Sequence, residues 1–242
     1  MAEELNAVIA VRPFSSVLIS HAGLMAKWKG DLPAMRATLD RLDSLDRGDD
    51  SAVFMAMWCG LLERQPERVL EAAGRTTRAY LEGPDFTGPK AWLPALAQLI
   101  AGRSVAAREQ WEAAEAVLRE RLRTDAGQQS MRVQLATTLA WLGRADEAAR
   151  ELAPVEAAWR EELTPAHAKR LAAYYGAAGD APRAVPLLRK VLHGGNGMIG
   201  LTVPLLKLDP WWDKLRSAPE FQALLTHPPP MPAPLRAAAP SK

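Results

Sequence analysis

The chain of 242 residues carries 30 Lys and Arg against 28 Asp and Glu, a net charge of +2, and 48% of its residues are hydrophobic. This composition is typical of a soluble globular protein, argues against extensive disorder, and does not favour nucleic acid as a partner. A single cysteine excludes an internal disulfide, no Cys/His spacing indicates a zinc site, and no apolar run approaches the roughly 20 residues that span a bilayer.

Residues 1–15 are expected to form a lead-in to the main fold. Glu3 and Glu4 stand where a secretory signal would carry positive charge, and the apolar stretch at 7–11 is too short for the core of such a signal. We therefore expect a cytoplasmic protein that does not associate with membranes.

Residues 16–200 are predicted to form helical hairpins. The pattern Trp-x-Gly recurs at 28–30, 58–60 and 141–143, and glycine readily adopts the left-handed conformation that ends a helix. Pro66 is expected to begin one helix and Pro94 to lie in the first turn of another. The predicted bends between paired helices lie at Gly30, Gly60, Gly102, Gly143 and Gly179.

The clearest repeat is a stretch at 135–148 that aligns without gaps onto 171–184. Every matched pair is 36 positions apart, as Gly143 is from Gly179. Apolar residues at three- and four-residue spacing give each copy one helix face, and Ala148 and Ala184 are small enough for close helix contact. One such hairpin cannot bury its apolar side alone, so neighbouring hairpins are expected to stack.

These residues resemble the tetratricopeptide repeat. The resemblance implies an all-α fold: a right-handed superhelical solenoid of antiparallel helix hairpins, here with a period longer than the family's ~34 residues. The proline that often closes a repeat in this family is replaced by Arg160. The matching positions are Leu135, Ala136, Leu139, Gly143, Ala148 and Leu152, then Leu171, Ala172, Tyr175, Gly179, Ala184 and Leu188.

Residues 201–225 are expected to form a pair of capping helices that close the stack. Asp209 can cap a helix that begins at Pro210, and Ser217 with Glu220 has the spacing of a capping box. Trp211 and Trp212 are adjacent, so a helix cannot bury both in one direction, and one of them is expected to be exposed. The prolines of residues 226–242 predict a disordered tail.

The resemblance also implies a binding groove lined by the first helix of each hairpin. Members that bind chaperone tails hold a peptide carboxylate with Lys and Asn; Lys169 fits this pattern, whereas Ala173 replaces the asparagine. The groove is therefore expected to suit an extended or helical peptide. Its residues are predicted to be Val133, Thr137, Ala140, Lys169, Ala173 and Gly176, together with Lys27 and Trp92.

No constellation typical of catalysis or metal binding stands out. Cys59 has apolar neighbours that predict a raised pKa, and the four histidines show no pair at the spacing of ligands on one helix. The glycine-rich run at 193–197 follows a helix and is interpreted as a connector. The sequence therefore predicts neither a metal nor a cofactor, and favours a protein without enzymatic activity.

The leading hypothesis is a scaffold that binds a protein or peptide partner and no nucleic acid, with a homo-oligomer left open. A second hypothesis follows from residues 208–225, which look like the segment after such repeats in bacterial Ser/Thr kinases, adenylate cyclases and transcriptional activators, and makes the chain a regulatory module. A third is a hydrolase that uses Cys59 or a histidine such as His193 in the cavity of the superhelix.

Overall fold

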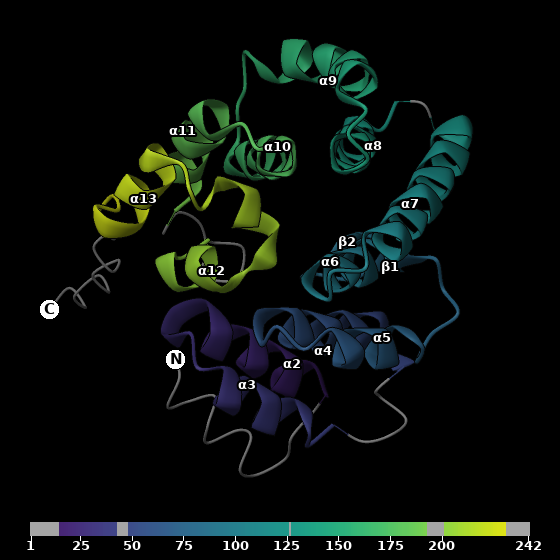
Figure 1. The fold of residues 1–242 in the computed structure, drawn as a ribbon, viewed down its shortest axis with the longest axis vertical. Coiled ribbons are helices and arrows are strands. Elements are labelled where there is room, and N and C mark those ends of the chain that lie inside the picture. The colour runs from purple at the N-terminus through teal and green to yellow at the C-terminus, as the bar shows by residue number, and fades with distance from the viewer. Residues whose placement is uncertain (1–14, 43–47, 126, 193–200, 231–242) are drawn as a thin grey trace, which may run out of the picture.

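The computed structural model describes residues 15–42, 48–125, 127–192 and 201–230, and these are mostly helical (Figure 1). The lead-in up to residue 14, the glycine-rich run and the tail from 231 lie outside the described residues. The first helices are α2 (Ser15–Leu24), the π-helix η1 (Met25–Lys29), α3 (Leu32–Leu39), α4 (Asp50–Leu62), α5 (Pro66–Ala73) and α6 (Trp92–Ile100). They are followed by α7 (Ser104–Thr124), α8 (Gln129–Trp141), α9 (Ala145–Trp159), α10 (Pro165–Ala178), α11 (Ala181–Val191), α12 (Val203–Leu208), the 3₁₀-helix η3 (Pro210–Leu215) and α13 (Pro219–Thr226).

Consecutive helices pack in pairs, and each pair packs on the next. α4 packs on α5, α6 on α7, α8 on α9 and α10 on α11, while α5 with α6 and α8 with α10 join neighbouring pairs. Figure 1 shows these pairs following one another along a curve. A single pair has too little interior to bury both its faces, so each helix depends on the pair beside it for burial. The predicted helical class is thus confirmed.

Glycine bends join the helices of the repeated unit as predicted. Gly143 and Gly179 have φ of 76° and 74°, and the residue after each returns a hydrogen bond to a carbonyl five positions back. Arg144 N donates to Leu139 O at 2.9 Å, and Asp180 N donates to Tyr175 O at 2.9 Å. These bonds satisfy carbonyls that the helix end leaves free.

The bend predicted at Gly60 is wrong. Gly60 lies inside α4, and the left-handed residue is Arg64, with φ of 58°, followed by the bond from Gln65 N to Gly60 O at 2.8 Å. A Cβ atom on Gly60 would lie 3.0 Å from Cγ2 of Val69. Glycine is needed at this position because α5 passes close to α4, and not because the backbone turns there.

A short β-hairpin, which the sequence analysis did not anticipate, separates α5 from α6. Its strands β1 (Tyr80–Glu82) and β2 (Thr87–Pro89) are antiparallel, with Tyr80 opposite Pro89. The buried Asp50 carboxylate at the start of α4 accepts hydrogen bonds from Glu82 N and from Arg78, both at 3.0 Å. A buried carboxylate needs such donors, and this one fixes the hairpin against α4.

After α11 the chain returns to the first helices. α12 packs on η1, where the hydroxyl of Thr202 donates to the carbonyl of Lys27, and α13 packs on α11. Figure 1 places α12 inside the curve of helices. The described part of this segment holds three short helices where the prediction had a pair.

The two capping predictions for this segment have opposite outcomes. Asp209 caps η3 as predicted, because its Oδ1 accepts from Trp211 N at 2.9 Å. The capping box at Ser217 is wrong: α13 begins at Pro219, and the residue before it, Ala218, makes no side-chain cap. α13 also includes Thr226, the first residue of the predicted disordered tail.

Candidate functional site

The inner face of the curve is built around one tryptophan of the C-terminal segment. The ring centroid of Trp211 lies 5.3 Å from that of Trp92, 5.9 Å from that of Trp141 and 6.5 Å from that of Trp111. Trp111 and Trp141 stack face to face at 5.2 Å. Large aromatic contacts of this kind contribute more than the burial of their area alone, so η3 is held firmly to α6, α7 and α8.

The predicted exposure of one of the paired tryptophans is wrong. Trp211 is half-buried, and its Nε1 donates to the carbonyl of Ala173 at 3.1 Å, while Trp212 is only 4% exposed. A Cβ atom on Gly176 would lie 2.9 Å from the Trp212 ring, so the absent side chain is what lets this indole pack against α10. A 3₁₀-helix completes one turn in about three residues, so the side chains of the adjacent Trp211 and Trp212 leave the helix in different directions and pack against different partners.

Charged groups fix both ends of η3. Asp209 accepts a hydrogen bond from Nε1 of Trp58 at 3.2 Å, and burial raises the pKa of its carboxyl. Asp213 binds both Nη atoms of Arg64, at 2.6 and 2.7 Å. Burial alone would raise the pKa of Asp213, but hydrogen bonds from Arg64 and Arg216 outweigh it and lower that pKa. The Lys214 ammonium lies 4.1 Å from the Trp141 ring centre and donates to the carbonyl of Ala177 at 2.6 Å.

Several predicted groove residues belong to the core. Val133 and Thr137 are each 2% exposed, and the Thr137 hydroxyl donates to the Val133 carbonyl at 2.7 Å. Trp92 is buried, and its Nε1 donates to the hydroxyl of Thr138 at 2.9 Å. Ala140 and Ala173 are half-buried. Among the predicted groove residues, Ala140, Ala173 and Lys169 are only half-buried and therefore have side-chain surface that a partner could contact.

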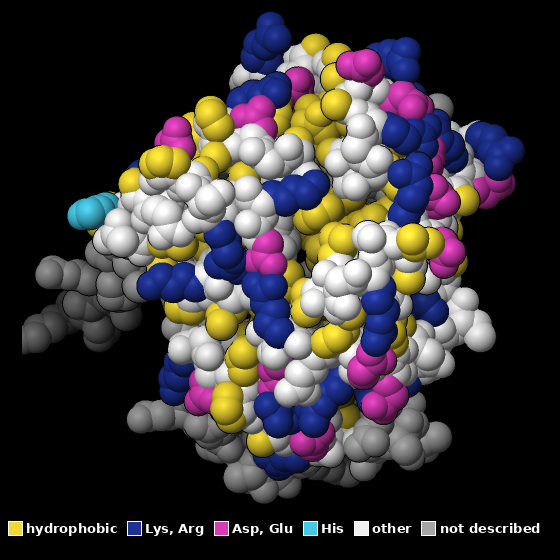
Figure 2. Space-filling view, in the orientation of Figure 1, with side chains coloured by type: hydrophobic (Ala, Val, Ile, Leu, Met, Phe, Trp, Pro, Cys, Tyr) yellow, Lys and Arg dark blue, Asp and Glu magenta, His cyan; other side chains and the backbone are white. Residues whose placement is uncertain are grey.

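Two lysines from distant parts of the chain lie within electrostatic reach of each other. Lys27 binds Asp85 of the β-hairpin at 3.3 Å, and both side chains are largely buried. Lys169 on α10 is half-buried; loss of hydration and then the charge of Lys27 lower its pKa to about 8. Figure 2 shows a hollow in this view of the molecule, with hydrophobic side chains inside and Lys and Arg at its edge.

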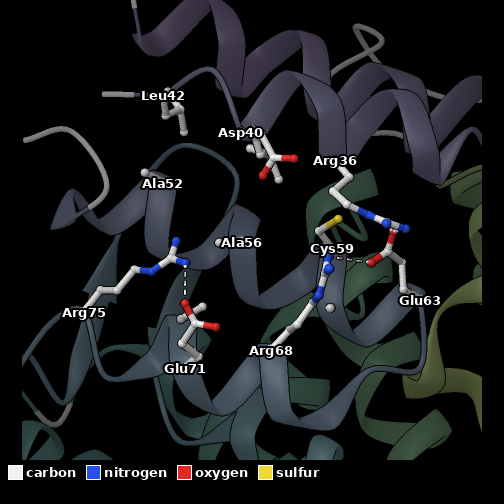
Figure 3. A pocket seen from close by; sticks show the side chains of 13 residues that line it. Arg36, Asp40, Leu42, Ala52, Ala56, Cys59, Glu63, Arg68, Glu71 and Arg75 are labelled. Carbon is white, nitrogen blue, oxygen red and sulfur yellow. Dashed lines mark hydrogen bonds and ion pairs between the residues drawn. The ribbon is translucent and has the colours of Figure 1, made fainter. Parts of the chain in front are cut away.

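A separate pocket, which the sequence analysis missed, lies between α3, α4 and α5 (Figure 3). Its volume is about 330 Å³. One signal could have found it: Ala52, Ala56 and Gly60 recur at every fourth position, which leaves one face of α4 without large side chains. The lining residues are Arg36, Leu39, Asp40, Leu42, Ala52, Ala56, Cys59, Gly60, Glu63, Arg68, Glu71, Ala72 and Arg75.

Cys59 lines this pocket, but it has the wrong electrostatics for a nucleophile. Burial first, and the nearby Glu63 carboxylate second, raise the pKa of its thiol to about 12. The raised pKa predicted from the apolar neighbours is thus confirmed. A thiol with this pKa carries almost no thiolate at neutral pH, so Cys59 is unsuited to covalent catalysis.

The histidines that the structure describes have separate local partners. His21 is buried and contacts the hydroxyl of Thr38 at 3.1 Å; burial lowers its pKa. His167 stacks on Trp159, with ring centroids 4.1 Å apart. His193 lies outside the described residues. Within the described ranges, no three His, Cys, Asp or Glu side chains come together as metal ligands would.

Comparisons with protein-family models, with curated proteins and with solved structures each found no match to this chain. Among the helices of the described residues, none combines the length and the apolar character needed to cross a membrane.

Proposed function

We propose that this protein is an interaction scaffold, a right-handed solenoid of tetratricopeptide-like hairpins whose inner face binds a segment of a partner protein. One observation carries the proposal. The inner face already holds a polypeptide segment, Asp209–Lys214 of its own chain, through ring contacts, hydrogen bonds to backbone carbonyls and ion pairs. These are the contacts by which helical scaffolds bind peptides in general.

The bound segment indicates which partner chemistry the face suits. Asp209 and Asp213 lie on either side of Trp211, and each carboxylate meets a donor of the helical array, Trp58 in one case and Arg64 in the other. A partner segment with an aromatic residue and nearby carboxylates would find the same kinds of group beside Trp211. Ala140 and Lys169 are both half-buried, and the Asp209 carboxylate is one of the charges that act on Lys169.

Affinity capture with matched variants tests the proposal. We expect the wild-type protein to retain partners that are lost with both Lys169→Glu and Ala140→Trp, since the first reverses a charge and the second fills space. Arg150→Glu, an exposed charge reversal on α9, is the control and should retain them. A set of captured proteins that is the same for all four chains would contradict the assignment of the inner face.

A further inference from the structure

The pocket between α3, α4 and α5 is an apolar trough with charged walls. Its floor is the face of α4 that carries Ala52, Ala56 and Gly60, which at 1.5 Å per residue extends for about 12 Å. Leu39 and Leu42 close the α3 side, and Ala72 belongs to α5. Figure 3 shows the charged side chains of α3 and α5 standing around this floor.

One end of the trough holds a buried carboxylate that is only half satisfied. The Glu63 side chain is 3% exposed, and its Oε1 accepts hydrogen bonds from both Nε and Nη2 of Arg36. Its Oε2 is buried and accepts no hydrogen bond from any residue that the structure describes. Buried carboxylate oxygens normally have a donor, so this atom marks a place for one.

A guanidinium with unused donors stands beside that oxygen. Nη1 of Arg68 lies 3.7 Å from Oε2 of Glu63, which is an ion-pair distance but too long for a hydrogen bond. The Arg68 side chain is about half exposed and makes no hydrogen bond to the described part of the chain. A carboxylate oxygen without a hydrogen-bond donor and a guanidinium without a hydrogen-bond acceptor therefore lie side by side as an ion pair, and both residues line the trough.

The charges around the trough balance. Arg36, Arg68 and Arg75 are matched by Asp40, Glu63 and Glu71, and Arg75 binds Glu71 at 3.3 Å. A simple anion would meet three carboxylates, and a simple cation would meet three guanidinium groups. A molecule that carries both charges close together, attached to an apolar body, avoids both conflicts.

We propose that this pocket binds a free α-amino acid with an apolar side chain. Once the half-exposed Arg68 side chain moves off the covered oxygen, the ligand's ammonium group donates to Oε2 of Glu63 and its carboxylate accepts from Arg68. These two ligand groups are attached to one carbon atom, which suits protein groups that lie 3.7 Å apart. The side chain follows Ala56 and Ala52 along the trough, and the pocket volume of 330 Å³ lies in the range of small-molecule sites. This site does not depend on the scaffold function.

Calorimetric titration with three related compounds tests the charge pattern. We expect L-leucine to bind with a Kd on the order of 1 mM or tighter, and L-leucinamide and 4-methylpentanoate to bind roughly tenfold more weakly, because each lacks one charged group. Equal binding of all three, or the absence of leucine binding, would overturn the proposal. If Oε2 is satisfied by water alone, the second result is the one observed.

Variants test the place of binding. Arg68→Gln should weaken leucine binding roughly tenfold, and Ala56→Phe should abolish it by filling the trough. Arg108→Gln is the matched control, because Arg108 is an exposed arginine on α7 with a single carboxylate partner. Ala56→Phe could impair folding, so the decisive variant for the place of binding is Arg68→Gln, which changes a half-exposed side chain. Unchanged leucine binding by Arg68→Gln would locate the ligand elsewhere.

Discussion

The hairpins α8–α11 and α2–α5 reach similar geometry by different sequence solutions. In α8–α11 the bend within each hairpin has a glycine with positive φ, and the two hairpins share an ungapped repeat of 36 positions. In α2–α5 the chain enters the bend at Gly30 through a π-helix, and the bend after α4 uses Arg64 at φ of 58°. At the three bends of Arg64, Gly143 and Gly179, the next amide bonds to a carbonyl five residues back. This backbone hydrogen bond is therefore the common feature of the three bends, and glycine is the residue that adopts the left-handed conformation there with the least strain.

Arg64 holds a left-handed backbone, and another contact offsets part of its cost. For residues with a Cβ atom this conformation costs roughly 1–2 kcal/mol. The Arg64 guanidinium binds both carboxylate oxygens of Asp213, a paired geometry that is stronger than a single hydrogen bond. The irregular bend of α2–α5 is thus coupled to the C-terminal segment, whereas the bend at Gly143 has no atom of the described residues near its missing side chain.

The largest effect is expected when the contacts of η3, which connect α2–α5 with α8–α11, are removed. Trp211→Ala removes a ring that touches three other tryptophans and should lower the free energy of unfolding by about 3 kcal/mol. Urea denaturation measures this loss, and hydrogen exchange should show weaker protection in both α4 and α10. Val105→Ala, at a side chain that is 74% exposed, is the control and should change little. Loss of protection confined to η3 would show that the two regions are independent.

Gly60→Ala should cost about 2 kcal/mol through overpacking, because the new Cβ would lie 3.0 Å from Cγ2 and 3.2 Å from N of Val69. Val69→Ala in the same chain should recover part of that loss, since it removes the nearer atom. A double-mutant cycle by urea denaturation gives the coupling energy. Strict additivity of the two changes would contradict the packing explanation.

Gly143→Ala should cost about 1 kcal/mol, and here the reason is backbone strain at φ of 76°. No change in a neighbouring side chain should relieve it, because no atom of the described residues lies within 4 Å of the added Cβ. Gly143→Asn should cost less, since asparagine tolerates the left-handed region. Equal costs for alanine and asparagine, measured by thermal unfolding, would argue against strain.

The pKa of Lys169 tests whether the charge of Lys27, at the N-terminal end of the fold, acts on α10. Its ammonium should titrate near pH 8, and Lys27→Met should raise that pKa, because the charge of Lys27 is one of its causes. NMR of the lysine side chains measures both values. The folded pKa lies below the unfolded value of roughly 10.4, so the unfolded state binds more protons between these values. Stability should therefore rise with pH across that interval, and a fall would contradict the assigned direction.

The smallest net effect is expected for Arg64→Gly. Relief of the strained backbone should offset the loss of the exposed pair with Asp213, which is worth about 0–1 kcal/mol. Asp213→Asn keeps the strain and weakens the pair, so it should destabilise the chain more than Arg64→Gly does. Thermal unfolding of both variants in low and high salt provides the comparison, and the opposite ranking would contradict it.

The sequence predicted what depends on neighbours along the chain. The bends at Gly143 and Gly179, the helix start at Pro66, the place of Pro94 in the first turn of α6 and the cap at Asp209 all follow from local hydrogen bonds and are confirmed. These features need only residues within about one helical turn of each other.

The features that the sequence did not predict depend on contacts between residues that are far apart in the chain. Trp58 and Asp209 are 151 positions apart, so nothing in the local pattern indicates that η3 occupies the inner face. The sequence around Gly60 resembles that of a bend, but the need for glycine at this position comes from the close approach of Val69. The pocket was also not predicted, because its walls combine Arg36 of α3, Glu63 at the end of α4 and Arg68 of α5.

The hydrogen bond between Thr202 and Lys27 also limits how this architecture can change. Open arrays of repeats lengthen by duplication, because an added unit only moves the two ends further apart. Here the last segment rests on the first helices, 175 positions away, so one more hairpin would pull that junction open and uncover Trp211. This contact therefore favours changes of length in the segments that connect the helices over the addition of a further helix pair.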